Sequence, residues 1–232
     1  MKRVILLLFI SVSVSDAQLV EENFDYIAGV LTAVSTNWIE SPTGSTDIQI
    51  FNENLFFSGY QSSNIGNLIM LDGGASGRSG INRTFAVQST AGTTIYWSFL
   101  LNVTSTAEMD SSGGIGDYFS NFQNSTMTQN KSYLYLKQGS DSSKYCIGLA
   151  KASSVSLIWH EAELNVNTTY LIVAGYSIVS GTGNDISKLW INPALTGDEP
   201  AADLTVTAVL DNISAFVLEQ NFLNPFNPST II

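Results

Sequence analysis

Short runs of alternating apolar and polar residues dominate the chain, and clusters of glycine, asparagine and serine separate these runs. The clearest run is Thr94–Val103, in which every odd position from Ile95 onward is apolar. A period of two residues is typical of a β-strand. The even positions include Tyr96 and Leu100, so both faces of this strand have apolar character, and we expect a central strand that is buried on both sides.

Further runs of the same kind predict more strands along the second half of the chain. They are Ser132–Lys137, Tyr145–Ala150, Val155–Trp159, Tyr170–Val179, Lys188–Ile191 and Leu204–Leu210. Helical periodicity is nearly absent, no internal repeat is visible, and we expect Ile213–Glu219 to form another strand. Short strands at this spacing predict an all-β chain folded as a β-sandwich or jelly roll.

The first residues have the pattern of a secretory signal peptide. Lys2 and Arg3 precede the apolar stretch Val4–Val14, and small residues stand before a cleavage point after Ala17. This stretch is shorter than the roughly 20 residues that a membrane-spanning helix needs. We expect a signal peptide at 1–17, a sandwich at 18–212 and a separate C-terminal segment at 213–232.

Charge and cysteine content narrow the classes of partner. The formal charge is −11, and removal of the signal peptide with Lys2, Arg3 and Asp16 changes it to −12. Nucleic acids and anionic lipids are bound mainly by clustered Lys and Arg, so this acidic chain favours a cation, a neutral sugar or a protein. Cys146 is the only cysteine, and the fold therefore depends on its core rather than on internal disulfides.

The final residues carry a first resemblance to a known family. Gln220–Ile232 reads Gln-Asn-Phe-Leu-Asn-Pro-Phe-Asn-Pro-Ser-Thr-Ile-Ile. It resembles the opening of the C-terminal sorting domain of type IX secretion cargo in Bacteroidetes, usually Gln-Asn-Tyr-Pro-Asn-Pro-Phe-Asn-Pro-Ser-Thr, with Phe222 and Leu223 as the two departures. The resemblance implies export, a secreted or cell-surface location, the secretion machinery as a partner, and a linker with a truncated sorting domain at 213–232.

A series of small motifs through the middle of the chain carries a second resemblance. In order, these are Asn23-Phe24-Asp25-Tyr26 with Gly29, Trp38, Ser58-Gly59-Tyr60, Gly66-Asn67, Asn82-Arg83-Thr84-Phe85, Tyr96-Trp97-Ser98-Phe99-Leu100, Gly116-Asp117-Tyr118-Phe119, Asn167-Thr168-Thr169-Tyr170-Leu171 and Lys188-Leu189-Trp190-Ile191-Asn192-Pro193. This order resembles the concanavalin A-like or laminin-G-like modules of large secreted bacterial proteins. The resemblance implies a jelly-roll β-sandwich, and a fold alone does not transmit an activity.

The sequence offers an incomplete glycosidase pattern. Retaining glycosidases on this fold place two carboxylates about 5 Å apart, at alternate positions of one strand. Glu161 and Glu163 have that spacing, but Asn165 stands where a third carboxylate of the family 16 pattern would be. No serine or cysteine nucleophile motif surrounds His160, which we expect at the surface. We therefore expect no catalytic residues.

Two loops combine glycine with residues that could supply oxygen ligands to Ca²⁺. One is Asp110–Asp117, and the other contains Asn184 and Asp185 at an expected hairpin tip. Glycine, asparagine and aspartate are also the residues that tight turns require. Turn chemistry is the preferred interpretation of both loops, and a calcium ion held by Asn184 and Asp185 is the alternative.

Sugar binding needs exposed aromatic rings beside polar side chains. Tyr118 with its neighbour Asp117, together with Trp159 and Tyr60, are our candidate ligand-binding residues, and Trp38 has a similar setting. Trp97 and Trp190 lie inside apolar runs and are assigned to the core. The preferred hypothesis is a non-catalytic module that binds glycans or surface polymers. A structural or adhesive domain of a larger protein is the second hypothesis, and a glycosidase is the third.

Overall fold

The computed structural model describes residues 19–40, 47–71, 80–124, 129–152, 154–181, 183–207 and 217–218. The expected signal peptide at 1–17 and the sorting motif at 220–232 lie outside these residues. Within the described ranges, the two helical segments are α1 (Leu31–Val34) and the 3-10 turn η1 (Ser154–Ser156), and no helix is long and apolar enough to cross a membrane.

One sheet has four antiparallel strands, in the order β14-β13-β12-β6. They are β6 (Thr94–Asn102), β12 (Thr169–Ser177), β13 (Ile186–Ile191) and β14 (Leu204–Val206). The expectation that the run beginning at Thr94 is a central strand is wrong, because β6 is the last strand on one side of this sheet. Both of its faces are apolar because other parts of the chain cover the sheet on both sides.

The second sheet has eight strands, in the order β10-β9-β8-β7-β15-β5-β2 with β11 also paired to β9. They are β2 (Ile39–Glu40), β5 (Ile81–Thr84), β7 (Asp117–Gln123), β8 (Asn130–Gln138), β9 (Lys144–Ala150), β10 (Ile158–Trp159), β11 (Leu164–Asn165) and β15 (Val217–Leu218). β15 pairs with β5 and β7. The large sheet therefore includes Leu218, which lies within the run Ile213–Glu219 that was expected to form a strand.

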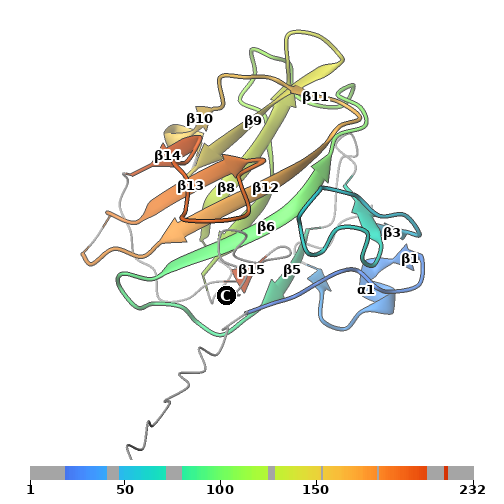
Figure 1. Cartoon of the computed structure of the whole chain (residues 1–232), viewed down its shortest axis with the longest axis horizontal. Coiled ribbons are helices and arrows are strands. Elements are labelled where there is room, and N and C mark those ends of the chain that lie inside the picture. The colour runs from blue at the N-terminus through green and yellow to red at the C-terminus, as the bar shows by residue number, and fades with distance from the viewer. Residues whose placement is uncertain are drawn as a thin grey trace, which may run out of the picture.

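The main core lies between these two sheets, which face each other in Figure 1. The odd-numbered side chains of β6 enter this core, as the alternation predicted. Trp97 is fully buried and meets Phe122 of β7 edge to face, with ring centroids 4.2 Å apart. Leu134 and Leu149 of the large sheet are also fully buried. The all-β prediction is confirmed in the form of two packed antiparallel sheets.

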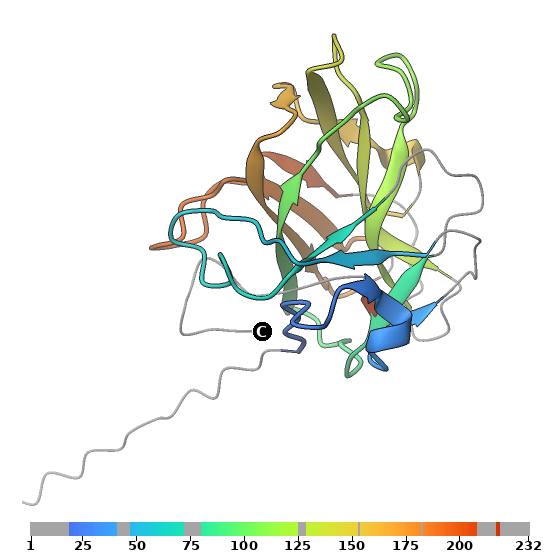
Figure 2. The same cartoon turned by 90° about the vertical axis from the view of Figure 1, so that its right-hand side faces the viewer.

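A third layer is built by the N-terminal part of the chain (Figure 2). Its strands are β1 (Gly29–Val30), β3 (Gln49–Phe51) and β4 (Leu68–Met70), in the order β1-β3-β4, and α1 packs with them around a small core of its own. The loop after β3 brings Tyr60 against the outer face of the four-stranded sheet, beside Val173 and Trp190. The sequence runs did not predict these short strands.

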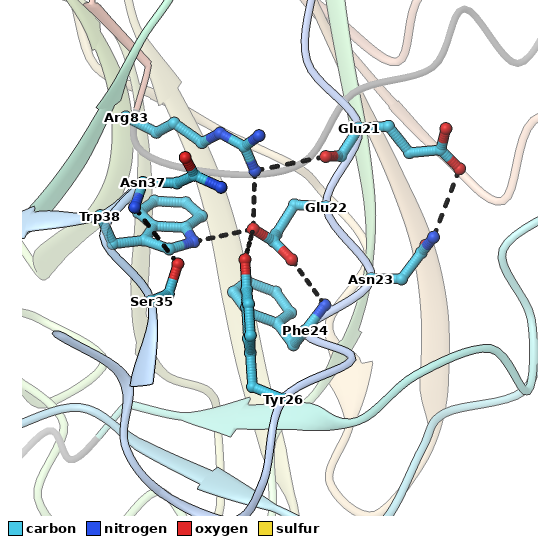
Figure 3. Close-up of polar contacts among 9 residues, drawn as sticks. All are labelled: Glu21, Glu22, Asn23, Phe24, Tyr26, Ser35, Asn37, Trp38 and Arg83. Carbon is cyan, nitrogen blue, oxygen red and sulfur yellow. Dashed lines mark hydrogen bonds and ion pairs between the residues drawn. The ribbon is translucent and has the colours of Figure 1, made fainter. Parts of the chain in front are cut away.

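Glu22 anchors this N-terminal layer (Figure 3). Its side chain is 5% exposed. Oε2 accepts hydrogen bonds from the Tyr26 hydroxyl at 2.9 Å and from Trp38 Nε1 at 3.0 Å, and it pairs with Arg83 Nη1 at 2.6 Å. Because Arg83 belongs to β5, this ion pair joins the N-terminal layer to the eight-stranded sheet.

The same carboxylate supports an unusual backbone conformation at Phe24. Phe24 has a φ of 51°, a left-handed conformation that costs a residue with a side chain about 1–2 kcal/mol. Glu22 Oε1 accepts a hydrogen bond from the Phe24 N–H at 2.8 Å, and the Phe24 ring stacks on Trp38 with centroids 5.7 Å apart. These two contacts hold the turn in which the chain enters the layer.

Two buried tyrosines of the main core give a matched test of core energetics. Tyr145 and Tyr176 are both fully buried, but the Tyr176 hydroxyl donates to Asp185 Oδ2 at 2.7 Å, whereas the Tyr145 hydroxyl has no hydrogen-bond partner in the described part of the chain. We expect Tyr145→Phe to raise the free energy of unfolding by about 1 kcal/mol and Tyr176→Phe to lower it by about 1–3 kcal/mol. Denaturant unfolding measures both, and equal losses would contradict the assignment.

The anchor at Glu22 generates a second prediction. We expect Glu22→Gln to lower the free energy of unfolding by about 3 kcal/mol, because the amide leaves the Arg83 guanidinium without its ion pair and turns one donor group toward other donors. Because the Arg83 side chain is 20% exposed, we expect the loss of stability to lie at the lower end of the range for broken buried ion pairs. The control is Glu21→Gln at the exposed neighbour, which should change stability by less than about 0.5 kcal/mol. Similar losses in the two variants would exclude the anchoring role.

Candidate ligand-binding surface

Three aromatic residues form one cross-strand row on the eight-stranded sheet. Tyr118 of β7 pairs with Tyr135 of β8, Tyr135 pairs with Gly148 of β9, and Gly148 pairs with Trp159 of β10. Directly paired residues of neighbouring strands project to the same face of a sheet. This face is the outer one, because the alternate residues Leu134 and Leu149 point into the main core. We call Tyr118, Tyr135 and Trp159 the aromatic row.

Tyr118 is the most exposed member of the row. Tyr118 is 52% exposed, whereas Tyr135 is 6% exposed and lies against it, with ring centroids 6.0 Å apart. Tyr133, two residues before Tyr135 on β8, adds a third ring 5.3 Å from that of Tyr118. Burial, with a smaller contribution from neighbouring Tyr118, raises the pKa of Tyr135 above its usual value. The Tyr135 hydroxyl therefore stays protonated and able to donate a hydrogen bond at neutral pH.

Glycine makes room for the indole at the other end of the row. A Cβ atom at Gly148 would lie 2.8 Å from Trp159 Cε3, and one at Gly116 would lie 2.8 Å from Trp159 Cη2. Real Cβ contacts are not that short, so any side chain at either position would displace the ring. The two glycines thus allow Trp159 to lie directly on the backbone of β9 and beside the start of β7.

Lys137 adds a cation beside Trp159. Its Nζ lies 4.5 Å from the centre of the indole ring, within the range of a cation–π interaction. The same Nζ donates a hydrogen bond to the carbonyl of Ser112 at 2.8 Å. Lys137 therefore ties the loop before β7 to the aromatic row and brings hydrogen-bond donors to its tryptophan end.

Hydrogen bonds within the loop Asp110–Asp117 and to β8 hold this loop. Asp110 Oδ2 accepts from the Gly116 N–H at 3.0 Å, and the Asp110 carbonyl accepts from the Gln138 N–H at 2.9 Å. These bonds agree with the turn interpretation of this loop. They also fix the backbone just before Tyr118.

Asp185 does not present its oxygens at a hairpin tip, so that expectation is wrong. The residue is 6% exposed, and its carboxylate accepts hydrogen bonds from the Val179 N–H at 2.8 Å and the Tyr176 hydroxyl at 2.7 Å. Asn184 Nδ2 donates to the Ser180 carbonyl. Asp185 turns inward because these two donors hold its carboxylate. Among the described residues, no group of three or more His, Cys, Asp and Glu side chains is placed to hold a metal ion.

The structure brings together two of the four candidate ligand-binding residues, Tyr118 and Trp159. Asp117 is exposed, but as the neighbour of Tyr118 on β7 it faces the other side of the strand, where it lines a groove described below. The expectation of an exposed ring is wrong for Tyr60 and also for Trp38. Tyr60 is 8% exposed with its hydroxyl near the Ser98 side chain at 3.0 Å, and Trp38 belongs to the Glu22 anchor.

Glu161 and Glu163 do not extend from one strand. Residues 161–162 form a bend between β10 and β11. Both oxygens of Glu163 are engaged by Ser140, whose N–H and hydroxyl donate at 2.6 and 2.7 Å. His160 Nδ1 lies 2.8 Å from the Ala162 carbonyl within the same bend. This geometry assigns Glu163 to holding the loop at Ser140.

Sequence reasoning missed Tyr135, Lys137 and the two supporting glycines. The alternation Tyr133-Leu134-Tyr135-Leu136-Lys137 does predict that one face of β8 carries two tyrosines and a lysine. What the pattern does not contain is the register of β8 against β7 and β9. That register decides which residues share a row.

Comparison of the chain with protein-family models, with curated proteins and with solved structures gives no match.

The buried Tyr60 generates a prediction for alkaline pH. Burial raises the pKa of Tyr60 to about 12, although the hydrogen bond with Ser98 acts in the opposite direction. An unfolded tyrosine ionises near pH 10. Between about pH 10 and pH 12 the unfolded chain has therefore released a proton that the folded chain retains, so the free energy of unfolding falls as pH rises through this window.

We expect Tyr60→Phe to make that fall less steep, by an amount on the order of 2 kcal/mol over the window. Denaturant unfolding at several pH values from 8 to about 12 measures the slope. Tyr118→Phe, which removes an exposed hydroxyl, is the control. An unchanged slope in Tyr60→Phe would show that the folded protein does not resist ionisation at this position.

Proposed function

We propose that the protein is a non-catalytic glycan-binding module and that the aromatic row on the outer face of the eight-stranded sheet is its binding surface. The alignment of Tyr118, Tyr135 and Trp159 in one cross-strand row is the observation that carries the proposal. Sugar rings present apolar C–H faces and polar edges. Aromatic side chains with nearby hydrogen-bonding groups match both.

The length of the row favours a sugar chain over a single sugar. Tyr118 and Trp159 stand on strands that are three steps apart, which corresponds to about 14 Å at the usual spacing of neighbouring strands. That span exceeds one sugar ring. Tyr118 is the more exposed anchor, and the Lys137 ammonium at the other end can donate to hydroxyl or carboxylate oxygens of a ligand.

We further propose that the two sheets form a concanavalin A-like jelly roll and that the protein is exported to the cell surface or beyond. The antiparallel pairing throughout and the core between two facing sheets support the first proposal. The residues at 1–17 and the motif at 220–232 support the second. A surface location would give the aromatic row access to polysaccharides.

The full chain is first screened against a glycan array and against soluble β-glucan, xylan, mannan and polygalacturonate, with calcium and again with chelator. We expect binding to at least one polymer and survival of that binding in chelator, because the aromatic row needs no metal. Tyr118→Ala should weaken binding at least about tenfold, the effect of losing roughly 1.4 kcal/mol at an aromatic anchor. Gly148→Ala should also weaken it, since the new methyl group displaces Trp159 while every aromatic ring is kept.

Phe56→Ala is the matched control, because Phe56 is 59% exposed and lies on the loop between β3 and β4. It should leave the affinity within about twofold. Thermal unfolding of each variant shows whether the fold is kept. Binding that is lost equally in Phe56→Ala, or that is unaffected by Tyr118→Ala, would contradict the aromatic row as the binding surface, and no binding to any polymer would contradict the proposed function.

A further inference from the structure

A groove of about 840 Å³ opens between the N-terminal layer and the two main sheets. β4 contributes Leu68–Met70, and the last part of β6 contributes Phe99 to Asn102. Its volume lies within the range of about 300–1,000 Å³ typical of ligand-binding clefts. The groove is separate from the aromatic row except at Tyr118, which borders both.

The described strands on both sides of the groove end their sheets. β6 pairs with β12 alone, and β4 pairs with β3 alone. A strand at the end of a sheet turns alternate N–H and C=O groups away from its partner, and such groups are a template for pairing with another extended chain.

The hydrogen bonds at the two ends of β6 show which of its residues face outward. The carbonyls of Thr93 and Val103 accept from Ile178 and Asn167, on the β12 side. Odd-numbered residues therefore turn toward β12, and even-numbered residues turn their backbone groups to the open edge. The Ser98 carbonyl agrees, since it accepts from the Tyr60 hydroxyl at 3.2 Å. Beyond Ser98, the outward backbone groups of Leu100 and Asn102 have no partner in the described part of the chain.

Exposed apolar side chains and carboxylates surround this open edge. Met70 and Leu71 are 51% and 43% exposed, and Ile65 is 50% exposed. Glu53, Glu108 and Asp117 are exposed carboxylates that line the same groove. The described lining includes no Lys or Arg. An occupant is therefore favoured if it has apolar side chains and positive charge.

We propose that the groove binds an extended, positively charged peptide segment, which adds as a strand to the open edge of β6 at Leu100 and Asn102. Main-chain hydrogen bonds to the strand edge supply affinity in this mode of recognition, and alternate side chains supply specificity. One set of alternate side chains packs against the apolar lining. The other set carries Lys or Arg toward Glu53, Glu108 and Asp117. This partner class is independent of the glycan-binding proposal.

The test measures by calorimetry the binding of a short, end-blocked peptide of alternating Lys and Val residues to the full chain. We expect this peptide to bind and the matching Glu and Val peptide not to bind. Two further versions of the Lys and Val peptide carry methyl groups on alternate backbone nitrogens, one version on each edge of the extended peptide. We expect the version methylated on the edge that faces β6 not to bind, because strand addition needs those N–H groups. Replacement of Glu53, Glu108 and Asp117 together by Lys should weaken binding at least about tenfold.

The matched control replaces Asp25, Asp47 and Asp198 by Lys, which changes the net charge equally at exposed positions outside the groove. It should change the affinity by less than about threefold. Equal losses in the two triple variants would reduce the interaction to non-specific charge attraction and overturn the proposal. Full binding by both methylated peptides, or no binding by the unmodified peptide, would overturn it as well.

Discussion

Strand β12 is buried on both of its faces, and the layered architecture follows from that constraint. Its even-numbered residues Ile172 to Tyr176 enter the core between the two sheets, while Leu171 and Val173 face the other way and are equally buried. Apolar surface left in water would forfeit about 25 cal/mol for each Å². A two-sheet sandwich covers one face only. The segments that follow β3 and β13 cover the second face. The segment after β3 is part of the N-terminal layer, which Glu22 holds in place.

The sequence predicted the parts of this arrangement that depend on local pattern. Alternation identified β6, β8, β9, β12 and β13 to within two residues at each end, and it assigned the faces of β6 correctly. It failed where burial is produced by a distant segment. The two apolar faces of β6 suggested a central strand, but the pattern in one strand cannot tell whether a neighbouring strand or a covering loop hides its second face. The short strands β1 to β4 contain two to three residues each, too few to establish a period.

The candidate site shows the same division between local and non-local information. Tyr118 and Trp159 were identifiable because each is an aromatic residue near a loop, but Tyr60 has the same local setting and is buried by the sheet that it covers. Asp185 resembles a ligand at a turn until its two hydrogen-bond donors are known. Ser98 is 38 residues from Tyr60, and the contact of Asp185 with Tyr176 depends on how the hairpin between β12 and β13 folds, so local pattern indicates neither.

Gly148 is the position at which local preference and the observed structure disagree most clearly. Glycine within a strand costs roughly 0.5–1 kcal/mol relative to alanine, and β9 is a well-paired strand between β8 and β10. A methyl group there would lie 2.8 Å from Trp159 Cε3 and 2.9 Å from Leu157 Cδ1, so the glycine is explained by the two side chains that lie over it. Positions that depart from local preference are expected to be functional or strained sites. The indole itself is not required to fill the main core, because it lies on the outer face. The combination of an unfavourable strand residue and a ring on the outer face is one of the features that support the proposed glycan-binding surface.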